Sequence, residues 1–416
     1  MSTDERSDVE DYGLAEAFEA HDPYPAYERI RAAAPTHYNP LVQGWLITRY
    51  ADVAAAFRHP ALSADRMAAY ARVLPPELLA KVEPLIRNLS AWILMRDPPA
   101  QTRIRGLLSA AFTPRFVAGM RERTAKIVDE LIDAVADREG FDLIESIAYP
   151  LPVRVIGDML GLPPEDCDRL KSWSDALASF LGVARIDPAV VARAVRSIVE
   201  MEAYFNEVIA ARRAEPGDDL VSLMVAAHDE DGRLSDQELV SSCCMILFGG
   251  HETTTNLIGN GIYLLLRHPE QARRLREDPS LVDSAIEEIL RYEAPVQRMG
   301  RISVGPVELG DATIPPGQRV YMVMAAANRD AAEFPDADTF DVGRKGSRHL
   351  SLGVGVHYCL GAALGRLEGK LAIPALLRRF PALALDPAHA PEWIDNITIR
   401  GFERLPVVTG AAAAAR

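Results

Sequence analysis

The sequence predicts a mainly α-helical fold with small β-sheets. Segments in which apolar residues recur at helical spacing outnumber the alternating, strand-like segments several-fold. Of the 416 residues, 49% are hydrophobic, which is enough for a large core. Because no internal repeat or linker-like segment divides the chain, we expect a single domain over residues 1–416, with flexible ends at about 1–13 and 410–416.

Apolar spacing places most of the predicted elements along the chain. It predicts helices at residues 26–34, 51–57, 102–111, 118–136, 190–214 and 362–379, and strands at 45–48, 319–323 and 397–399.

The longest predicted helix begins at Ser235. Ser235 and Glu238 have the spacing of a capping box, in which each side chain accepts a hydrogen bond from the other residue's amide. The apolar pattern continues to Leu266 and Pro269 ends it, which gives a helix roughly 50 Å long. Since it is apolar on nearly every side, we expect this helix to be central and buried.

Within this helix lies an unusual polar sequence, Gly249-Gly250-His251-Glu252-Thr253-Thr254. Two glycines cost a helix roughly 1 kcal/mol each relative to alanine. Close packing against another helix would explain the glycines, but not an acid beside threonines on a buried helix. A helix that opens beside a flat ligand, with a carboxylate and a hydroxyl placed to transfer protons, explains both.

A second unusual segment surrounds Cys359, just before the helix predicted at 362–379. Gly353 and Gly355 permit a tight turn, and Gly361 lets the backbone approach a flat group. Free amides at a helix start favour a thiolate, so we expect the pKa of Cys359 to fall. A lone cysteine is more often a packing residue. No further ligands have the spacing of a zinc site, whereas an axial thiolate ligand of haem needs one cysteine.

Composition excludes several classes of protein. A net charge of −14 argues against nucleic-acid binding through a general basic surface. No apolar run approaches the ~18 residues of a membrane span, and the acidic N-terminus does not resemble a secretion signal. We therefore expect a cytoplasmic protein. Its other cysteines, Cys167, Cys243 and Cys244, are interpreted as packing residues.

Five motifs together resemble the cytochrome P-450 family, in particular its soluble bacterial members. They are Gly353-x-Gly355-x-His357-x-Cys359-x-Gly361, the helix sequence Gly249-Gly250-x-Glu252-Thr253, the pair Glu288-x-x-Arg291, the segments 328–330 and 340–344, and the segment 97–105. The motifs occur in the family's order and span residues 23–408, so the resemblance covers nearly the whole chain.

The resemblance implies the family's fold, with haem b (iron protoporphyrin IX) between the long central helix and the cysteine loop. Cys359 would be the iron ligand, and Glu252 and Thr253 would be catalytic residues that manage protons during dioxygen activation. Further haem-binding residues would be Gln101, Arg105, Gly249, Arg301, His357 and Gly361, the cations among them as partners of the propionates. Glu288 and Arg291, joined by Arg344, would be structural.

The resemblance also implies a substrate pocket. Its predicted lining residues are Met245, Phe248, Gly249, Val296, Gln297, Thr398 and Ile399, with further contacts from the regions 63–92 and 169–186. Such a lining predicts a mostly apolar molecule with a few polar groups. The family usually has phenylalanine where this chain has Leu352, which leaves the surroundings of the sulfur open.

The implied function is a monooxygenase that inserts one oxygen atom from O2 into a largely apolar small molecule. The reaction would be hydroxylation or epoxidation of a secondary metabolite such as a polyketide, macrolide, terpenoid or peptide. Peroxide-driven oxidation fits the Glu252–Thr253 pair less well. Oxidative aromatic coupling or other tailoring of a carrier-bound substrate stays open, as does a non-enzymatic haem sensor or electron carrier.

Electrons would have to come from outside the chain, because the sequence has no room for a flavin or nicotinamide domain. We expect a ferredoxin-type iron–sulfur donor with its reductase. Arg115, Arg366 and Lys370 would form a basic patch for it, although a solvated face explains them almost as well. We expect no nucleic-acid or membrane partner, and a monomer.

Overall fold

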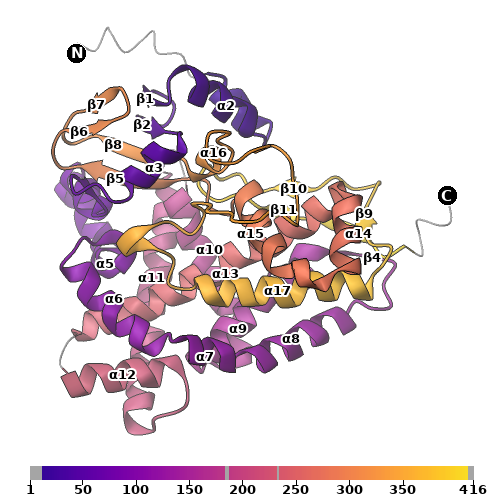
Figure 1. Ribbon diagram of the computed structural model, residues 1–416. Coiled ribbons are helices and arrows are strands. Elements are labelled where there is room, and N and C mark those ends of the chain that lie inside the picture. The colour runs from indigo at the N-terminus through magenta and orange to yellow at the C-terminus, as the bar shows by residue number, and fades with distance from the viewer. Residues whose placement is uncertain (1–11, 183–186, 232–233, 411–416) are drawn as a thin grey trace.

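The computed structural model describes residues 12–182, 187–231 and 234–410. The flexible ends expected at 1–13 and 410–416 therefore fall almost wholly outside the described residues, as does the end of the region 169–186. Figure 1 shows a helical body with a small sheet region at one side, beside α2 and α3. The prediction of a mainly α fold with small sheets is confirmed.

The helices in chain order are α1 (Leu14–Glu19), α2 (Tyr24–Ala33), α3 (Tyr50–Ala56), α4 (Arg66–Arg72), α5 (Pro76–Ala91), α6 (Ala100–Ala111), α7 (Pro114–Gly119), α8 (Arg121–Asp133), α9 (Pro150–Leu160), α10 (Cys167–Gly182), α11 (Pro188–Ala214), α12 (Leu220–Asp231), α13 (Asp236–Arg267), α14 (Pro269–Glu277), α15 (Val282–Tyr292), α16 (Met324–Ala327) and α17 (Ala362–Arg379). Among the described residues, no helix is both long enough and apolar enough to cross a membrane.

The strands are β1 (Thr36–Asn39), β2 (Gly44–Ile47), β3 (Leu62–Ser63), β4 (Gly140–Asp142), β5 (Met299–Ser303), β6 (Val307–Leu309), β7 (Ala312–Ile314), β8 (Arg319–Met322), β9 (Ala384–Leu385), β10 (Glu392–Trp393), β11 (Phe402–Arg404) and β12 (Pro406–Val408). The largest sheet has the order β1-β2-β8-β5-β3, in which only β2 and β8 pair in parallel.

Two sequence-based elements differ from the structure. The helix predicted at 118–136 corresponds mainly to α8, and its first two residues belong to α7, which ends at Gly119. Met120 separates the two helices, next to a glycine, which weakens a helix interior. The strand predicted at 397–399 is absent. Instead, the Asn396 side-chain oxygen accepts hydrogen bonds from the amides of Thr398 and Ile399, which turns the chain. Only an isolated bridge between Ile399 and Val296 remains.

Helix α13 is the central element of the body (Figure 1). It begins with the predicted capping box, since Ser235 Oγ accepts from the Glu238 amide at 3.2 Å and Glu238 Oε2 accepts from the Ser235 amide at 3.0 Å. Its 32 residues correspond to roughly 48 Å. Two thirds of them are buried, against neighbours that include α9, α11 and α17. Burial on all sides explains why its apolar residues follow no single face.

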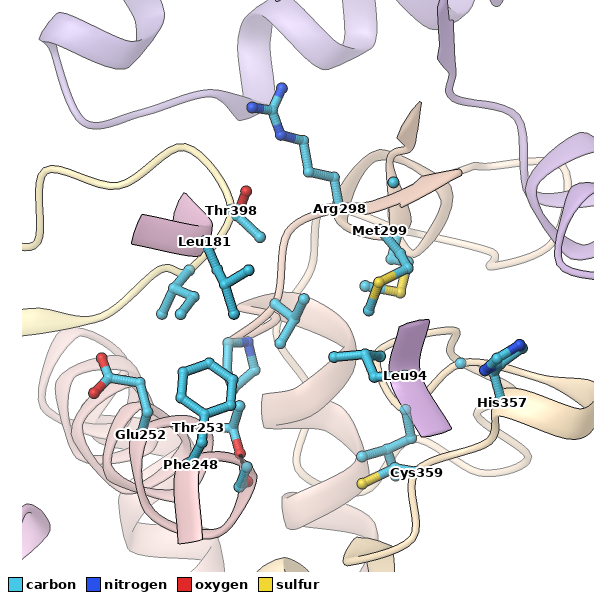
Figure 2. Close-up of a pocket in the computed structure, with 18 of the residues that line it drawn as sticks. Leu94, Leu181, Phe248, Glu252, Thr253, Arg298, Met299, His357, Cys359 and Thr398 are labelled. Carbon is cyan, nitrogen blue, oxygen red and sulfur yellow. Dashed lines mark hydrogen bonds between the residues drawn. The ribbon is translucent and has the colours of Figure 1, made fainter. Parts of the chain in front are cut away.

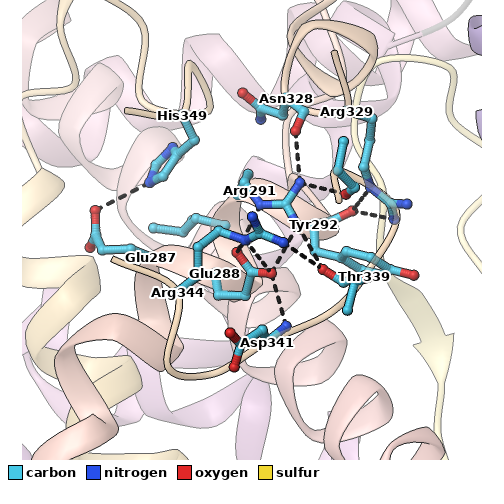
Figure 3. A network of polar contacts seen from close by, with 12 residues as sticks. Glu287, Glu288, Arg291, Tyr292, Asn328, Arg329, Thr339, Asp341, Arg344 and His349 are labelled. Carbon is cyan, nitrogen blue, oxygen red and sulfur yellow. Dashed lines mark hydrogen bonds and ion pairs between the residues drawn. The ribbon is translucent and has the colours of Figure 1, made fainter. Parts of the chain in front are cut away.

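A fully buried ion pair joins Glu288 and Arg291 on α15 (Figure 3). Arg291 Nε and Nη2 donate to the two Glu288 oxygens at 2.7 and 2.8 Å. The remaining guanidinium hydrogens bond three backbone carbonyls, those of Asn328, Ala337 and Thr339. Every donor of the Arg291 side chain is therefore satisfied inside the protein.

Glu288 is equally well partnered. Arg344 Nε lies 3.1 Å from its carboxylate, as predicted, and the Asp341 amide donates to it at 3.0 Å. The two α15 residues therefore position the chain from 328 to 344, which precedes the cysteine loop (Figure 3).

We predict that Arg291→Lys lowers the free energy of unfolding by about 3 kcal/mol or more, because lysine cannot reach the carboxylate and three carbonyls together and leaves buried acceptors unpaired. Urea unfolding followed by circular dichroism measures the change. The matched control is Arg273→Lys, in an exposed pair with Glu277, with an expected effect below about 0.5 kcal/mol. Equal effects of the two substitutions would contradict the assigned role.

Candidate active site

A cavity of about 630 Å³ lies between α13 and the loop that precedes α17. Figure 2 shows Phe248 and Thr253 on one side of it and Cys359 on the other, with Leu94, Leu181 and Met299 toward its far end. Most of the lining side chains are apolar. The cavity brings together the two unusual segments that the sequence singled out more than a hundred residues apart.

The cysteine loop has the tight conformation that its glycines predict. Gly353 and Gly355 have φ values of +68° and +71°, in the left-handed region that favours glycine. The Cys359 amide donates to the Leu352 carbonyl at 2.8 Å and closes the loop. Cys359 is thereby held three residues before α17 begins, at the cavity wall.

The electrostatic expectation for Cys359 is wrong in sign. Burial raises the pKa of the thiol above its ordinary value, and the Gly361 amide and the Arg105 guanidinium offset this only in part. The amides at the start of α17 act in the expected direction, but desolvation is the larger effect. The protein atoms alone therefore favour the neutral thiol.

The two adjacent glycines of α13 have different surroundings. A Cβ added to Gly250 would lie 2.6 Å from Ile156 of α9, so this glycine serves close helix packing. A Cβ added to Gly249 would meet no atom within 4 Å, and Gly249 lines the cavity. Close helix packing therefore explains Gly250, and an open surface beside a flat ligand explains Gly249.

Thr253 and Glu252 both line the cavity but point differently. The Thr253 hydroxyl donates to the Gly249 carbonyl at 3.3 Å, one turn earlier in α13. The Glu252 carboxylate points away from Cys359 in Figure 2 and lies in one cluster with His251 and with Asp175 of α10. Burial raises the pKa of Glu252, so this carboxyl holds a proton more strongly than an exposed glutamate does.

Two arginines, Arg105 and Arg301, line the cavity together with His357. Burial and the nearby charge of Arg66 lower the pKa of Arg301 to about 10, and its buried Nη2 has no hydrogen-bond partner in residues 12–182, 187–231 and 234–410. Burial and the charge of Arg301 lower the pKa of His357 to about 4. Asp97 is a nearby acidic group, but within the described part of the chain neither arginine forms an ion pair, so this end of the cavity favours an anion.

Gln101 and Gln297 do not lie at this cavity. Gln101 is fully buried, and its amide donates to the Val356 carbonyl at 2.7 Å behind the cysteine loop. Gln297 donates to the Ala294 carbonyl at 2.7 Å. Both amides find backbone partners in the protein, which turns them away from the cavity. The other predicted pocket residues line it, namely Met245, Phe248, Gly249, Val296, Thr398 and Ile399, as does the predicted haem-binding Gly361.

Several lining residues were not predicted individually. Arg66, Met67 and Tyr70 come from the region 63–92, and Phe180 and Leu181 from the region 169–186, which the sequence indicated only as regions. Arg298 and Met299 were missed, although they lie between Val296 and Arg301. Their position between two predicted site residues was the one feature of the sequence that indicated a place in the cavity wall.

The expected basic patch behind the cysteine loop is largely neutralised. Arg366 donates to both Glu287 oxygens, at 2.6 and 2.8 Å, and Lys370 pairs with Asp283 at 2.6 Å. Arg115 is exposed. The exposed side chains of Val356 and Tyr358 instead make the outer face of the loop partly apolar.

Comparison with known proteins gives a consistent result. The family model described as cytochrome P450 matches residues 169–398. Cytochrome P450 107B1 of Saccharopolyspora erythraea is 40% identical over 422 residues, which cover 99% of this chain and all of the relative. The 6-deoxyerythronolide B hydroxylase of the same organism is 38% identical, over 93% of this chain and 96% of its own.

Among solved structures, P450BioI in complex with an acyl carrier protein bearing hexadec-9Z-enoic acid superposes with a TM-score of 0.87 at 33% identity. The match covers 95% of this chain and 99% of that one.

Proposed function

Because the chain belongs to the cytochrome P450 family of haem b monooxygenases, we propose that it hydroxylates a large, mostly apolar secondary metabolite. The observation that supports this best is the meeting of Cys359 with the Glu252–Thr253 pair across one cavity of about 630 Å³. A haem sensor or electron carrier would not need an acid and an alcohol beside a large apolar pocket.

The residues present fit haem b. Cys359 offers one sulfur at the cavity wall, and the open side of Gly249 leaves room for a flat ring against α13. Arg105, Arg301 and His357 would hold the two propionates, whose charge supplies the anionic partners that these residues lack. Cys359 would hold the iron through its sulfur. When bound, haem supplies the redox centre at which dioxygen is activated.

The chain's own groups would position the reactants and move protons. The Thr253 hydroxyl, which donates to the Gly249 carbonyl at 3.3 Å, would be the group at the cavity wall that passes protons into the cavity. Glu252 would deliver protons to the same place. The apolar lining from Phe248, Leu94 and Leu181 would exclude water and orient the substrate.

The cavity also supports a substrate class. Its mostly apolar wall contains few polar groups away from the cationic end, Thr398 among them, which suits a macrolide- or polyketide-like molecule. The relative that acts on 6-deoxyerythronolide B supports this reading. A carrier-bound substrate is the alternative, favoured by the acyl carrier protein complex of the structural relative.

The electron donor would be a ferredoxin-type iron–sulfur protein that docks at the outer face of the cysteine loop. The exposed Val356 and Tyr358 would supply an apolar centre, and the exposed Arg58, which lies beside Gly355 of the same loop, would supply a cationic edge. We place the protein in the cytoplasm, where such donors are available.

The substrate class is tested by titration of the purified holoenzyme with 6-deoxyerythronolide B, other macrolactones and a fatty acyl group on an acyl carrier protein. A macrolactone should displace iron-bound water and shift the Soret band at micromolar concentration. A shift with the acyl carrier conjugate alone would favour the carrier-bound alternative instead.

Cys359→Ser should abolish the red-shifted Soret band of the reduced carbon monoxide complex, because serine does not supply a thiolate. Difference spectroscopy measures the band, and pyridine haemochrome analysis reports the haem content. Cys167→Ser, at a cysteine outside the cavity, is the control and should keep the band. Retention of the band in Cys359→Ser would disprove the assigned ligand.

Thr253→Ala should leave haem bound but divert reducing equivalents to hydrogen peroxide, because the hydroxyl that helps proton transfer is lost. Such transfer is typically worth 10²–10⁴-fold in rate. The peroxide formed per NADPH oxidised measures the effect. Thr313→Ala on β7 is a control at a residue that does not line the cavity. Unchanged coupling in Thr253→Ala would count against the role.

A further inference from the structure

His251 is a buried histidine in the middle of α13, beside Glu252, and its side chain is only 1% exposed. Its Nδ1 lies 3.4 Å from the Leu247 carbonyl, so Nδ1 is the nitrogen placed to carry the hydrogen of the neutral ring. Its Nε2 is buried and has no hydrogen-bond partner among the residues that the structure describes. A buried, unsatisfied ring nitrogen costs stability, which calls for a functional explanation.

Two carboxylates from different helices face this nitrogen. Nε2 lies 4.0 Å from Asp175 Oδ1 on α10 and 3.8 Å from Glu252 Oε2. One side-chain nitrogen or oxygen from each of Asp175, His251 and Glu252 lies within 4.8 Å of the other two. These separations fit one bridging water or a small rotation of a side chain.

The three residues form a path from solvent to the cavity. The Asp175 side chain is 43% exposed, that of His251 is 1% exposed, and Glu252 lines the cavity with 18% exposure. Glu252 points away from Cys359 in Figure 2, and its Oε2 lies 3.8 Å from His251 Nε2, on the side from which a proton would arrive.

We propose that His251 relays protons from Asp175 at the surface to Glu252 at the cavity wall. Nε2 accepts a proton from the Asp175 carboxyl or from water beside it, and the same nitrogen releases it to Glu252 Oε2. Nδ1–H stays on the Leu247 carbonyl throughout. Each passage moves one proton, returns the ring to its neutral form and breaks and makes only N–H and O–H bonds. The relay rests on the proposed monooxygenase function, which consumes two protons for each dioxygen.

The charges around the relay favour this direction. On α10, Lys171 Nζ lies 2.8 Å from Asp175 Oδ2 and 4.6 Å from the centre of the Tyr149 ring, which in turn packs edge-on against His251. Burial raises the pKa of Asp175, but His251 and Lys171 bring it below its ordinary value. Burial raises the pKa of Glu252, so a proton is held more strongly at the cavity end.

The same surroundings argue against a metal ion among these residues. The Lys171 ammonium already supplies a positive charge to Asp175, and a divalent cation between the carboxylates would be repelled by it. Tyr149 packs edge-on against His251, and its buried hydroxyl has no hydrogen-bond partner among the described residues. Burial raises the pKa of Tyr149, and Cys167 and Asp168 at the start of α10 add to this effect.

The relay is tested in the holoenzyme with dioxygen as the probe and electrons from NADPH through a surrogate plant-type ferredoxin and its reductase. His251→Gln and Asp175→Asn should each lower oxygen uptake at neutral pH by at least about 10-fold and enlarge the solvent deuterium isotope effect. Uptake in both variants should recover as the pH is lowered, because bulk protons then replace the relay. His389→Gln, in an exposed pair with Asp386, is the matched control and should behave as wild type.

The double variant separates a relay from a packing role. Two groups in series give a double variant no slower than the slower single one, whereas independent packing defects multiply. Multiplied losses with an unchanged isotope effect, or wild-type kinetics in Asp175→Asn, would overturn the relay. Asp175 is partly exposed, so its variant tests the proposal even if His251→Gln folds poorly. A wild-type protein that binds haem but reduces no dioxygen would instead disprove the proposed function.

Discussion

The buried ion pair between Glu288 and Arg291 is the interaction on which the cavity wall depends. Taking two charges out of water is costly, and the cost is offset here because every guanidinium hydrogen and both carboxylate oxygens have partners. Those partners are mostly backbone groups of the chain from 328 to 341. An interaction within one helix therefore determines the course of a distant loop.

Asn328 links the buried ion pair to the cysteine loop by hydrogen bonds. Its carbonyl is bound by Arg291, and its side chain bonds the Leu350 amide and the Ser351 hydroxyl at 2.7 Å each. Ser351 in turn donates to the Leu290 carbonyl at 2.6 Å. The next residue, Leu352, accepts the Cys359 amide. These hydrogen bonds, with the peptide link from Ser351 to Leu352, connect α15 to the backbone of Cys359 and position a loop that contains three glycines.

Local patterns predicted much of this organisation. The capping box at Ser235 and the bounds of α17 depend on residues that are near one another in the sequence. The contacts among Glu288, Arg291 and Arg344 could be predicted because these residues belong to a specific motif. Gln101 stands one helical turn before Arg105, yet its amide bonds Val356, a partner that helical spacing cannot reveal. The pairing of Arg366 with Glu287 and the burial of Cys359 likewise depend on tertiary packing, and both reversed an expectation.

The hydrogen bond between the Cys359 amide and the Leu352 carbonyl joins main chain to main chain. The loop is closed by atoms that every amino acid possesses, so the side chain at position 352 is not needed for closure. That side chain nevertheless lines the cavity close to the sulfur. Position 352 is therefore a place where evolution or engineering can alter the polarity and solvent access around the sulfur, and so its redox behaviour, while the loop keeps its shape.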